Sequence, residues 1–234
     1  MVETGPGWEL RLGRWQDALS GVRCSSLIFD APYSAATHAA VTTRNDNSAP
    51  DGLTPDYAAF TDDDVRRFCN SWRDRCDGWM VSLTDSRLAP VWGAEMEAIG
   101  RYAFAPVPCV IRGMSVRIQG DGPSSWAIWA VVSRPRNSEF VKWGTLPGAY
   151  TGPSQPGAGG GRGKPRWLLE ALVRDYTRPG DLICDPFAGW GSTICAAVAL
   201  GRRGIGAEMD AAAFAEAAAR VSRPTQIDMF GGAA

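Results

Sequence analysis

The chain has 234 residues, of which 45% are hydrophobic and 21% are charged, and its formal net charge at pH 7 is −1. This balance is typical of a globular protein that is long enough for one full hydrophobic core. No apolar run approaches the roughly 18 residues of a membrane span, and the first residues lack the basic and apolar regions of a signal peptide. We therefore expect a cytoplasmic protein with no membrane partner.

The sequence has six cysteines and one histidine, and none of the cysteine spacings suits a zinc motif. We therefore expect buried, reduced thiols and no metal. Charge is distributed unevenly: residues 51–100 carry 10 acidic residues against 5 arginines, whereas residues 101–180 carry 11 basic residues against 4 acidic ones. The basic region indicates a phosphate-binding face, with a solvated surface of uneven charge as the alternative.

The first elements lead to an acidic turn. Alternation predicts a strand over 8–12, helical spacing predicts a short helix over 15–19, and an apolar run predicts a buried strand over 26–29. This last strand runs into Asp30-Ala-Pro-Tyr33, so Asp30 is expected at the strand's carboxyl end. A strand that ends in a Pro-Tyr turn without a catalytic role is the alternative interpretation.

The middle of the chain predicts two long polar segments between regular elements. Residues 34–61 have no sustained periodicity and predict a long loop. Helices are expected over 61–75 and 88–99, and strands over 78–83, 104–111 and 125–132, the last two as an antiparallel hairpin. Residues 137–163 are polar, basic and glycine-rich, which predicts a flexible segment with no packed structure.

The last third is organised around the stretch from Asp181 to Glu208, which follows a predicted amphipathic helix over 164–176. It predicts a buried strand, a glycine turn, a helix that Ser192 or Thr193 caps, and a second strand that ends on Glu208. An acid at that position suits ribose hydroxyls. A structural unit without a ligand and a dinucleotide fold are the alternatives, although the third glycine of the dinucleotide fingerprint is missing. A helix is expected over 211–221.

Four segments resemble motifs of the S-adenosylmethionine-dependent DNA amino-methyltransferases, the adenine-N6/cytosine-N4 family. The segment 185–193 (Asp-Pro-Phe-Ala-Gly-Trp-Gly-Ser-Thr) resembles motif I, and 201–208 resembles motif II. The segment 30–33 resembles motif IV with alanine in place of its first proline, and 164–165 (Lys-Pro) resembles motif X. The order IV, X, I, II is that of the permuted β-type enzymes, and the four segments extend over nearly the whole chain.

The resemblance implies a Rossmann-like α/β methyltransferase fold. Its sheet is expected to be mostly parallel, with helices on both faces and an antiparallel terminal hairpin. We expect one methyltransferase domain over 1–222, which includes the 34–61 loop and a short target-recognition segment over 137–163. An exposed tail over 223–234 is expected to follow it.

The resemblance also implies two sets of functional residues. S-adenosylmethionine is the implied cofactor, and its binding residues are Asp185, Pro186, Phe187, Ala188, Gly189, Gly191, Ser192, Thr193 and Glu208, with Lys164 and Asp30 nearby. The implied catalytic turn is Asp30, Ala31, Pro32 and Tyr33. There a carboxylate and a backbone carbonyl accept the N–H groups of the target amine, and the tyrosine stacks on a flipped base.

We therefore expect site-specific methylation of an exocyclic amine in double-stranded DNA, as in restriction–modification, by a nucleoid-associated enzyme. Asp at position 30, where relatives also use Ser, favours adenine N6 over cytosine N4. A methyltransferase of RNA or of a protein amide, and a non-catalytic DNA-binding relative, are the alternatives; Ala31 favours the last. The residues predicted to contact DNA phosphates are Arg134, Arg136, Lys142 and Arg162.

Two further segments are compared with known families. Pro108-Cys109 matches the nucleophile of cytosine-C5 methyltransferases, but it precedes motif I instead of following it, so we predict that Cys109 is a buried strand residue. Many relatives have Gly-Asp after the first strand, with the acid near the cofactor's adenine, and this chain has Gly13-Arg14-Trp15 there.

The last residues contain a short recognition pattern. The segment 226–230 (Gln-Ile-Asp-Met-Phe) resembles the pentapeptide by which bacterial DNA-processing enzymes dock on the replicative sliding clamp. In this resemblance Gln226 fixes the register while Met229 and Phe230 fill an apolar pocket. Packing of Met229 and Phe230 back on the domain is the alternative, and the sequence does not predict an oligomeric state.

Overall fold

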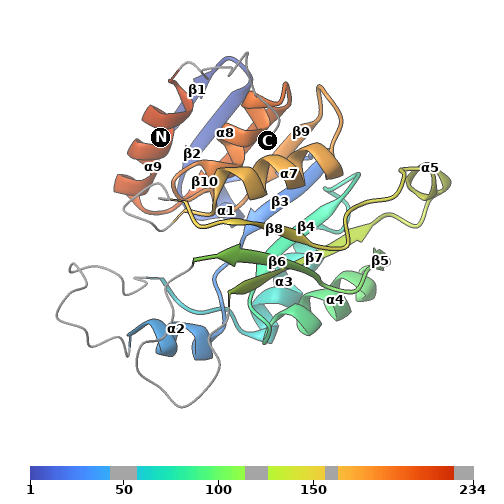
Figure 1. The fold of residues 1–234 in the computed structure, drawn as a ribbon. Helices are drawn as coiled ribbons and strands as arrows, with labels where there is room; N and C mark the ends of the chain where they lie inside the picture. The colour runs from blue at the N-terminus through green and yellow to red at the C-terminus, as the bar shows by residue number, and fades with distance from the viewer. Residues whose placement is uncertain (43–56, 114–125, 156–162, 224–234) are drawn as a thin grey trace. The chain divides into compact units, whose positions relative to one another are not determined.

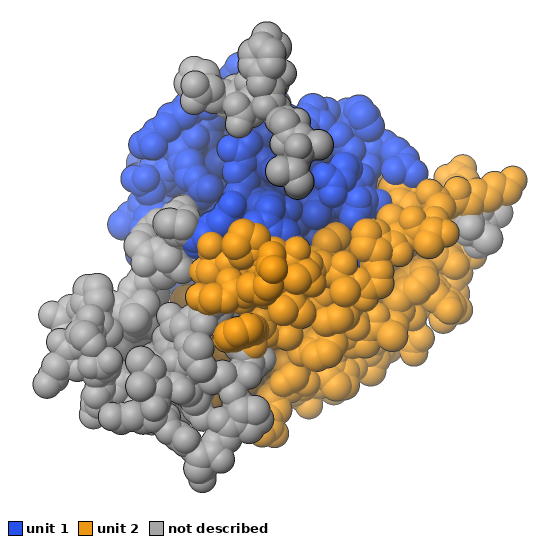
Figure 2. Space-filling model, in the orientation of Figure 1, with its two compact units in different colours: residues 1–22, 155–234 blue, residues 23–154 orange. Residues whose placement is uncertain are grey.

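The computed structural model describes residues 1–42, 57–113, 126–155 and 163–223 (Figure 1). The chain divides into two compact units (Figure 2). Unit 1 consists of residues 1–22 and 155–234, and unit 2 consists of residues 23–154. The chain therefore starts in unit 1, passes through unit 2 and returns. The single domain expected over 1–222 stays a prediction.

Unit 1 is an α/β unit with a largely parallel sheet. Its strands lie in the order β1-β2-β10-β9, with β2, β10 and β9 parallel and β1 antiparallel to β2. The carboxyl ends of the three parallel strands therefore share one edge. The elements are β1 (Val2–Gly5), β2 (Trp8–Leu12), α1 (Trp15–Ala18), α7 (Arg166–Tyr176), β9 (Leu182–Asp185), α8 (Ser192–Ala199), β10 (Arg203–Glu208) and α9 (Ala211–Val221).

The core of unit 1 forms between its strands and helices α8 and α9. Trp8 and Leu10 point to one face of β2, where they pack with Ile194 of α8 and Phe214 and Ala217 of α9. Because its alanine side chains are small, the buried face of α9 can lie close to β2 and α8. The core thus supports the turn between β9 and α8 from one side.

Unit 2 combines parallel and antiparallel strands. Its strands lie in the order β3-β4-β7-β6-β8, and β5 pairs with β7. Strand β3 is parallel to β4, β7 is antiparallel to β4 and to β6, and β8 is parallel to β6. The elements are β3 (Ser26–Asp30), α2 (Ala35–Thr42), α3 (Asp62–Trp72), β4 (Met80–Thr84), α4 (Ala89–Ala98), β5 (Tyr102–Ala103), β6 (Val107–Arg112), β7 (Ala127–Arg134), α5 (Ser138–Val141) and β8 (Tyr150–Pro153).

Aromatic side chains fill the core of unit 2. Phe29 of β3 lies 4.8 Å from Phe68 of α3 and 5.4 Å from Trp92 of α4, between ring centroids. Phe68 and Trp92 are also 5.4 Å apart in an edge-to-face arrangement. All three residues are fully buried, so they anchor the strand that leads to Asp30.

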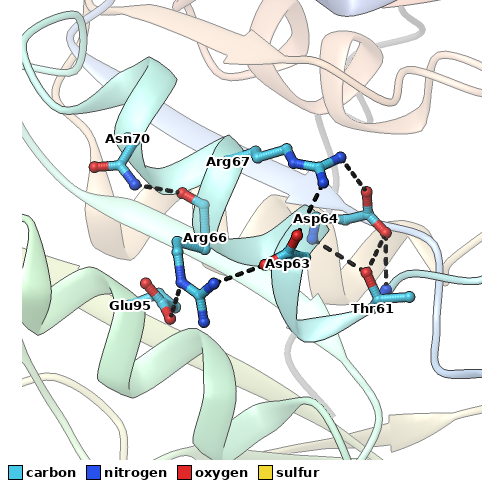
Figure 3. Close-up of polar contacts among 7 residues, drawn as sticks. All are labelled: Thr61, Asp63, Asp64, Arg66, Arg67, Asn70 and Glu95. Carbon is cyan, nitrogen blue, oxygen red and sulfur yellow. Dashed lines mark hydrogen bonds and ion pairs between the residues drawn. The ribbon is translucent and has the colours of Figure 1, made fainter.

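The exposed face of α3 carries a polar network (Figure 3). Thr61 and Asp64 form a capping box at its start. Arg66 contacts Asp63 at 2.6 Å and Glu95 of α4 at 3.3 Å. Because these side chains face solvent, each ion pair contributes at most about 1 kcal/mol, and the helix is stabilised chiefly by its buried aromatic face.

Most predicted elements are confirmed, with two corrections. The prediction of a loop over 34–61 is wrong where α2 forms. The alanine-rich run 35–40 has high helix propensity, and Ser34 accepts a hydrogen bond from the Thr37 N–H at the start of this helix. The prediction of a segment without packed structure over 137–163 is wrong where α5 and β8 form. Buried Tyr150 of β8 pairs with Cys109 of β6, which extends the sheet beyond the β6–β7 hairpin. The α/β class is confirmed.

Among the residues that the structure describes, no helix has both the length and the apolar character that crossing a membrane requires.

Candidate active site

The turn that follows β9 is the candidate cofactor-binding segment, and it lies in unit 1. Asp185 ends the strand and is 2% exposed, and its carboxylate accepts the backbone N–H of Phe187 at 3.0 Å. The Ala188 N–H donates to the carbonyl of Ala207 in β10 at 2.9 Å. Gly189 and Gly191 have φ values of 50° and 75°, which glycine adopts most readily. The turn is therefore tightly fixed by its own backbone.

Gly206 of β10 lets this turn lie directly on the strand. A Cβ atom at Gly206 would stand 2.9 Å from the Cβ of Ala188 and 3.2 Å from the carbonyl oxygen of Asp185. Any larger residue there would push the turn away from the sheet. The sequence pattern Gly-x-Gly in β10 therefore serves the turn's position as well as the strand.

Glu208 closes the other side of the turn. Its Oε2 atom accepts the Gly189 N–H at 2.8 Å, and its Oε1 atom accepts the Asp210 N–H at 2.8 Å. Burial raises the pKa of Glu208, although the N–H groups of Asp210 and Gly189 oppose this shift. A carboxylate oxygen can accept more than one bond, so Glu208 has the capacity for hydroxyl donors.

The start of α8 differs from the prediction. The helix begins after Gly191, and neither Ser192 nor Thr193 caps it with a side chain. The left-handed backbone of Gly191 turns the chain directly into the helix instead. The Ser192 hydroxyl accepts a bond from Arg220 at 2.8 Å, and Arg220 also donates to the Trp190 carbonyl at 3.1 Å. No local pattern in the chain indicates this long-range arginine contact.

The segment after β2 lies beside the same turn. The Gly13 N–H donates to the carbonyl of Glu208 at 2.8 Å. The ring of Trp15 lies 6.4 Å from that of Phe187 in an edge-to-face arrangement. An aromatic side chain thus lies near the turn, in the segment that follows β2.

Lys164 is the remaining residue predicted for this set in unit 1. It precedes Pro165, the residue before the first turn of α7, and it is partly buried. Helix α7 packs against α8, which follows the glycine turn. The predicted residues 185–193, Glu208 and Lys164 therefore belong to one unit.

The acidic turn after β3 is the candidate catalytic segment, and it lies in unit 2. Asp30 ends the strand and Ala31 is 3% exposed. The Tyr33 hydroxyl is buried near the carboxylate of Asp30. Burial, together with the negative charge of Asp30, raises the pKa of Tyr33 well above its usual value. Tyr33 therefore stays a neutral phenol beside Asp30.

Asp85 is a buried acid on the same sheet edge that the sequence interpretation missed. It follows β4, which is parallel to β3 with Leu83 opposite Asp30. Its carboxylate accepts bonds from Ser34, the residue after the turn. A usable signal was present, since Asp85 follows an apolar strand in the same way as Asp30 and Asp185.

Two of the predicted DNA-contacting residues, Arg134 and Arg136, lie away from Asp30 within unit 2. Arg134 and Arg136 lie 4.9 Å and 5.5 Å from the Tyr102 ring. In the antiparallel register of β7 with β4, Ser133 stands opposite Met80, so Arg134 lies at the amino end of β4 and Asp30 lies at the other edge. Lys142 is exposed after α5. Arg162 lies outside the described residues, as do the predicted clamp-binding residues Gln226, Met229 and Phe230.

Cys109 is a buried residue of β6, as predicted. Burial raises the pKa of its thiol to about 12. The thiolate that a cysteine nucleophile requires is therefore strongly disfavoured at this position.

Part of the chain is similar in sequence to known DNA methylases. Residues 146–219 match the family model described as DNA methylase. Over 48 residues the chain is 46% identical to the type II methyltransferase M1.MboII of Moraxella bovis, covering 20% of this chain and 18% of that protein. The chain is thus matched over about a fifth of the length of its curated relatives.

Solved structures resemble the chain over most of its length. The M1.HpyAVI–SAM complex is similar with a TM-score of 0.70 and 16% identity, covering 92% of this chain and 100% of that one. The cytosine-N4-specific PvuII DNA methyltransferase is similar with a TM-score of 0.65 and 15% identity, covering 96% and 89%. At such identities the likeness concerns the fold, and it confirms the predicted Rossmann-like α/β class.

Proposed function

From the confirmed resemblance to the S-adenosylmethionine-dependent DNA amino-methyltransferases, we propose that this chain transfers a methyl group from S-adenosylmethionine to an exocyclic amine of a DNA base. The observation that carries the proposal is the glycine turn 185–191, which lies against Gly206 and bonds Glu208. This turn lies within the residues that match the DNA methylase model.

The chemistry of the turn suits the cofactor. The absence of a side chain at Gly189 lets a ligand approach the backbone, and the buried carboxylate of Asp185 and the half-buried carboxylate of Glu208 can accept from amino and hydroxyl groups. Asp185 would hold the amino group of the methionine part and Glu208 the ribose hydroxyls. When bound, S-adenosylmethionine supplies a methyl group on a positively charged sulfur.

The turn 30–33 would act on the amine. The lone pair of an exocyclic amine is delocalised into the base, so the nitrogen is a poor nucleophile. Asp30 and the carbonyl of Ala31 would each accept one N–H, which favours a pyramidal nitrogen with an available lone pair. The nitrogen would then take the methyl group that bound S-adenosylmethionine supplies, the C–S electron pair would stay on sulfur, and one N–H proton would leave to solvent.

Tyr33 would have two tasks in this reaction. Its buried hydroxyl would orient the nearby carboxylate of Asp30, and its ring would stack on a base that has rotated out of double-stranded DNA. Replacing Tyr33 by phenylalanine would separate the two tasks, since only the hydroxyl is lost.

The target base is proposed from residue 30. The family tendency that pairs an acid at this position with adenine favours adenine N6. Cytosine N4 is the second candidate, because the similar fold of the PvuII enzyme belongs to a cytosine-N4-specific protein.

Labelled methyl transfer tests the proposal. The protein is incubated with S-adenosylmethionine that carries a labelled methyl group and, separately, with DNA, RNA and a protein pool. We expect label in DNA, recovered as N6-methyladenine after digestion to nucleosides, and none with Asp30→Ala. Asp77→Ala is the matched control, because Asp77 is an exposed aspartate of unit 2 and should leave transfer unchanged. Label in RNA or protein instead, or none anywhere, contradicts the proposal.

A further inference from the structure

The buried carboxylate of Asp85 joins two segments of unit 2. The residue is 8% exposed and follows β4, two residues beyond Leu83, which stands opposite Asp30 in the parallel register. Its position at the same sheet edge as Asp30 is therefore fixed by strand pairing.

The two oxygens of Asp85 have different partners. Oδ1 accepts the backbone N–H groups of Arg87 at 3.0 Å and Leu88 at 2.9 Å, which stabilises the start of α4. Oδ2 accepts the Ser34 N–H at 2.9 Å, the Ser34 hydroxyl at 2.6 Å and the Thr37 hydroxyl at 2.5 Å. Oδ1 thus bonds the residues just after Asp85 in the chain, and Oδ2 bonds the segment that follows Tyr33.

Asp85 is held in its charged form. Burial raises its pKa, but the hydroxyls of Ser34 and Thr37 and the N–H groups of Leu88 and Ser34 outweigh burial and lower it. Hydrogen bonds to a charged acceptor are roughly twice as strong as neutral ones. The hydrogen bonds from Ser34 to Asp85 are therefore strong for a contact between two loops.

The acidic turn is consequently fixed at both ends. Its first residue, Asp30, belongs to the β3 ladder. After the turn, Ser34 is held by Asp85, and the Tyr33 carbonyl accepts the N–H of Phe60 at 3.0 Å. Three residues lie between the two fixed ends, and one of them supplies the carbonyl proposed to face the amine.

We propose that Asp85 is a positioning residue for methyl transfer: through Ser34 and Thr37 it sets the geometry of the Asp30–Tyr33 turn. This inference rests on the proposed function. Asp85 touches neither amine nor cofactor in this role, so its loss should lower the rate of transfer and leave cofactor affinity unchanged. A purely structural cap of α4 would change only the stability.

The test is Asp85→Asn, compared with Asp64→Asn in the full chain. Asparagine keeps a carbonyl oxygen for Arg87 and Leu88 but presents an NH₂ group to the Ser34 N–H. Asp64 is the matched control, because its Oδ2 likewise accepts a backbone N–H and a hydroxyl, both from Thr61 (Figure 3). Three bonds reach the Asp85 oxygen and two reach the Asp64 oxygen, in each case from a backbone N–H and from hydroxyls, and only Asp85 contacts the segment that follows the acidic turn.

We expect kcat for DNA to fall about 10- to 100-fold in Asp85→Asn, the usual effect of a small misplacement of reacting groups. Its S-adenosylmethionine Kd in calorimetry should stay unchanged, and Asp64→Asn should keep wild-type kcat. Adding Ser34→Ala and Thr37→Val to Asp85→Asn should lower kcat little further, because the three residues act through one contact. The inference would be overturned by an unchanged kcat in folded Asp85→Asn. It would also be overturned if the effects of the three substitutions on kcat were simply additive.

Hydrogen exchange supplies a readout that does not depend on activity. In Asp85→Asn the peptides that cover residues 31–38 should exchange about tenfold faster, and those that cover 185–191 should not change. If the wild-type protein transfers no methyl group, the proposed function fails, and hydrogen exchange alone then tests whether Asp85 holds the acidic turn in place. Unchanged exchange over 31–38 in Asp85→Asn would contradict this role of Asp85.

Discussion

Replacing Gly191 by alanine tests whether the glycine turn depends on close packing as well as on backbone conformation. Gly191 has φ +75°, and a Cβ there would lie 3.1 Å from the Cβ of Ala217 and 3.2 Å from a methyl group of Val221. Gly201, at the other end of α8, has φ +72° and nothing within 4 Å of its Cβ position. Left-handed backbone costs an alanine about 1–2 kcal/mol at either site. Only Gly191→Ala adds overpacking, which costs about 1–3 kcal/mol.

Urea denaturation followed by tryptophan fluorescence measures this difference. We expect Gly191→Ala to be the less stable variant by about 1–3 kcal/mol. Calorimetry should also show weaker S-adenosylmethionine binding for Gly191→Ala and wild-type binding for Gly201→Ala, since only the first residue belongs to the turn. Equal destabilisation of the two variants would refute the packing argument, and equal cofactor affinity would refute the assignment of the turn as the cofactor cradle.

Three further predictions concern the cofactor, DNA and the tail. Ribose hydroxyls donate to a carboxylate, so protonation of Glu208 should weaken cofactor binding. Because the pKa of Glu208 is raised, we expect the affinity for S-adenosylmethionine to fall as the pH is lowered, and to begin falling at a higher pH than an ordinary glutamate would cause. In calorimetry, Glu208→Gln should remove this pH dependence. If Arg134 and Arg136 bind phosphates, the DNA affinity measured by filter binding should fall steeply with salt concentration, and the double alanine variant should show a weaker salt dependence. An unchanged salt dependence would mean that DNA binds to other residues. The sliding clamp of the host should be recovered with the intact protein and lost with Gln226→Ala/Phe230→Ala, and equal recovery would exclude the clamp contact.

The sequence predicted the parts of the fold that depend on local patterns. The apolar run before Asp30 and the strand–glycine–helix pattern around Gly191 fix short elements whose period and turn residues are visible in the chain. The acidic residues at the ends of β3 in unit 2 and of β9 and β10 in unit 1 followed from the same patterns, because each strand's apolar run leads directly into its acid.

The missed features depend on contacts between residues far apart in sequence. Asp85 is 51 residues from Ser34, and Arg220 is 28 residues from Ser192, so no local pattern marks either pair. Helix α2 was missed because its alanine-rich run lacks an amphipathic period. Arg134 was grouped with the DNA-binding residues by charge alone, and only the antiparallel register of β7 shows that it lies away from the Asp30 edge.

The central claim is that this chain methylates an exocyclic amine of DNA through Asp30. Single-molecule sequencing of DNA from cells that express the wild-type chain or Asp30→Ala tests it most directly, because it reports the modified base and its sequence context together. We predict N6-methyladenine at a defined sequence in cells with the wild-type chain and its absence in cells with Asp30→Ala. No modified base in either strain, or the same modification in both, would contradict the claim.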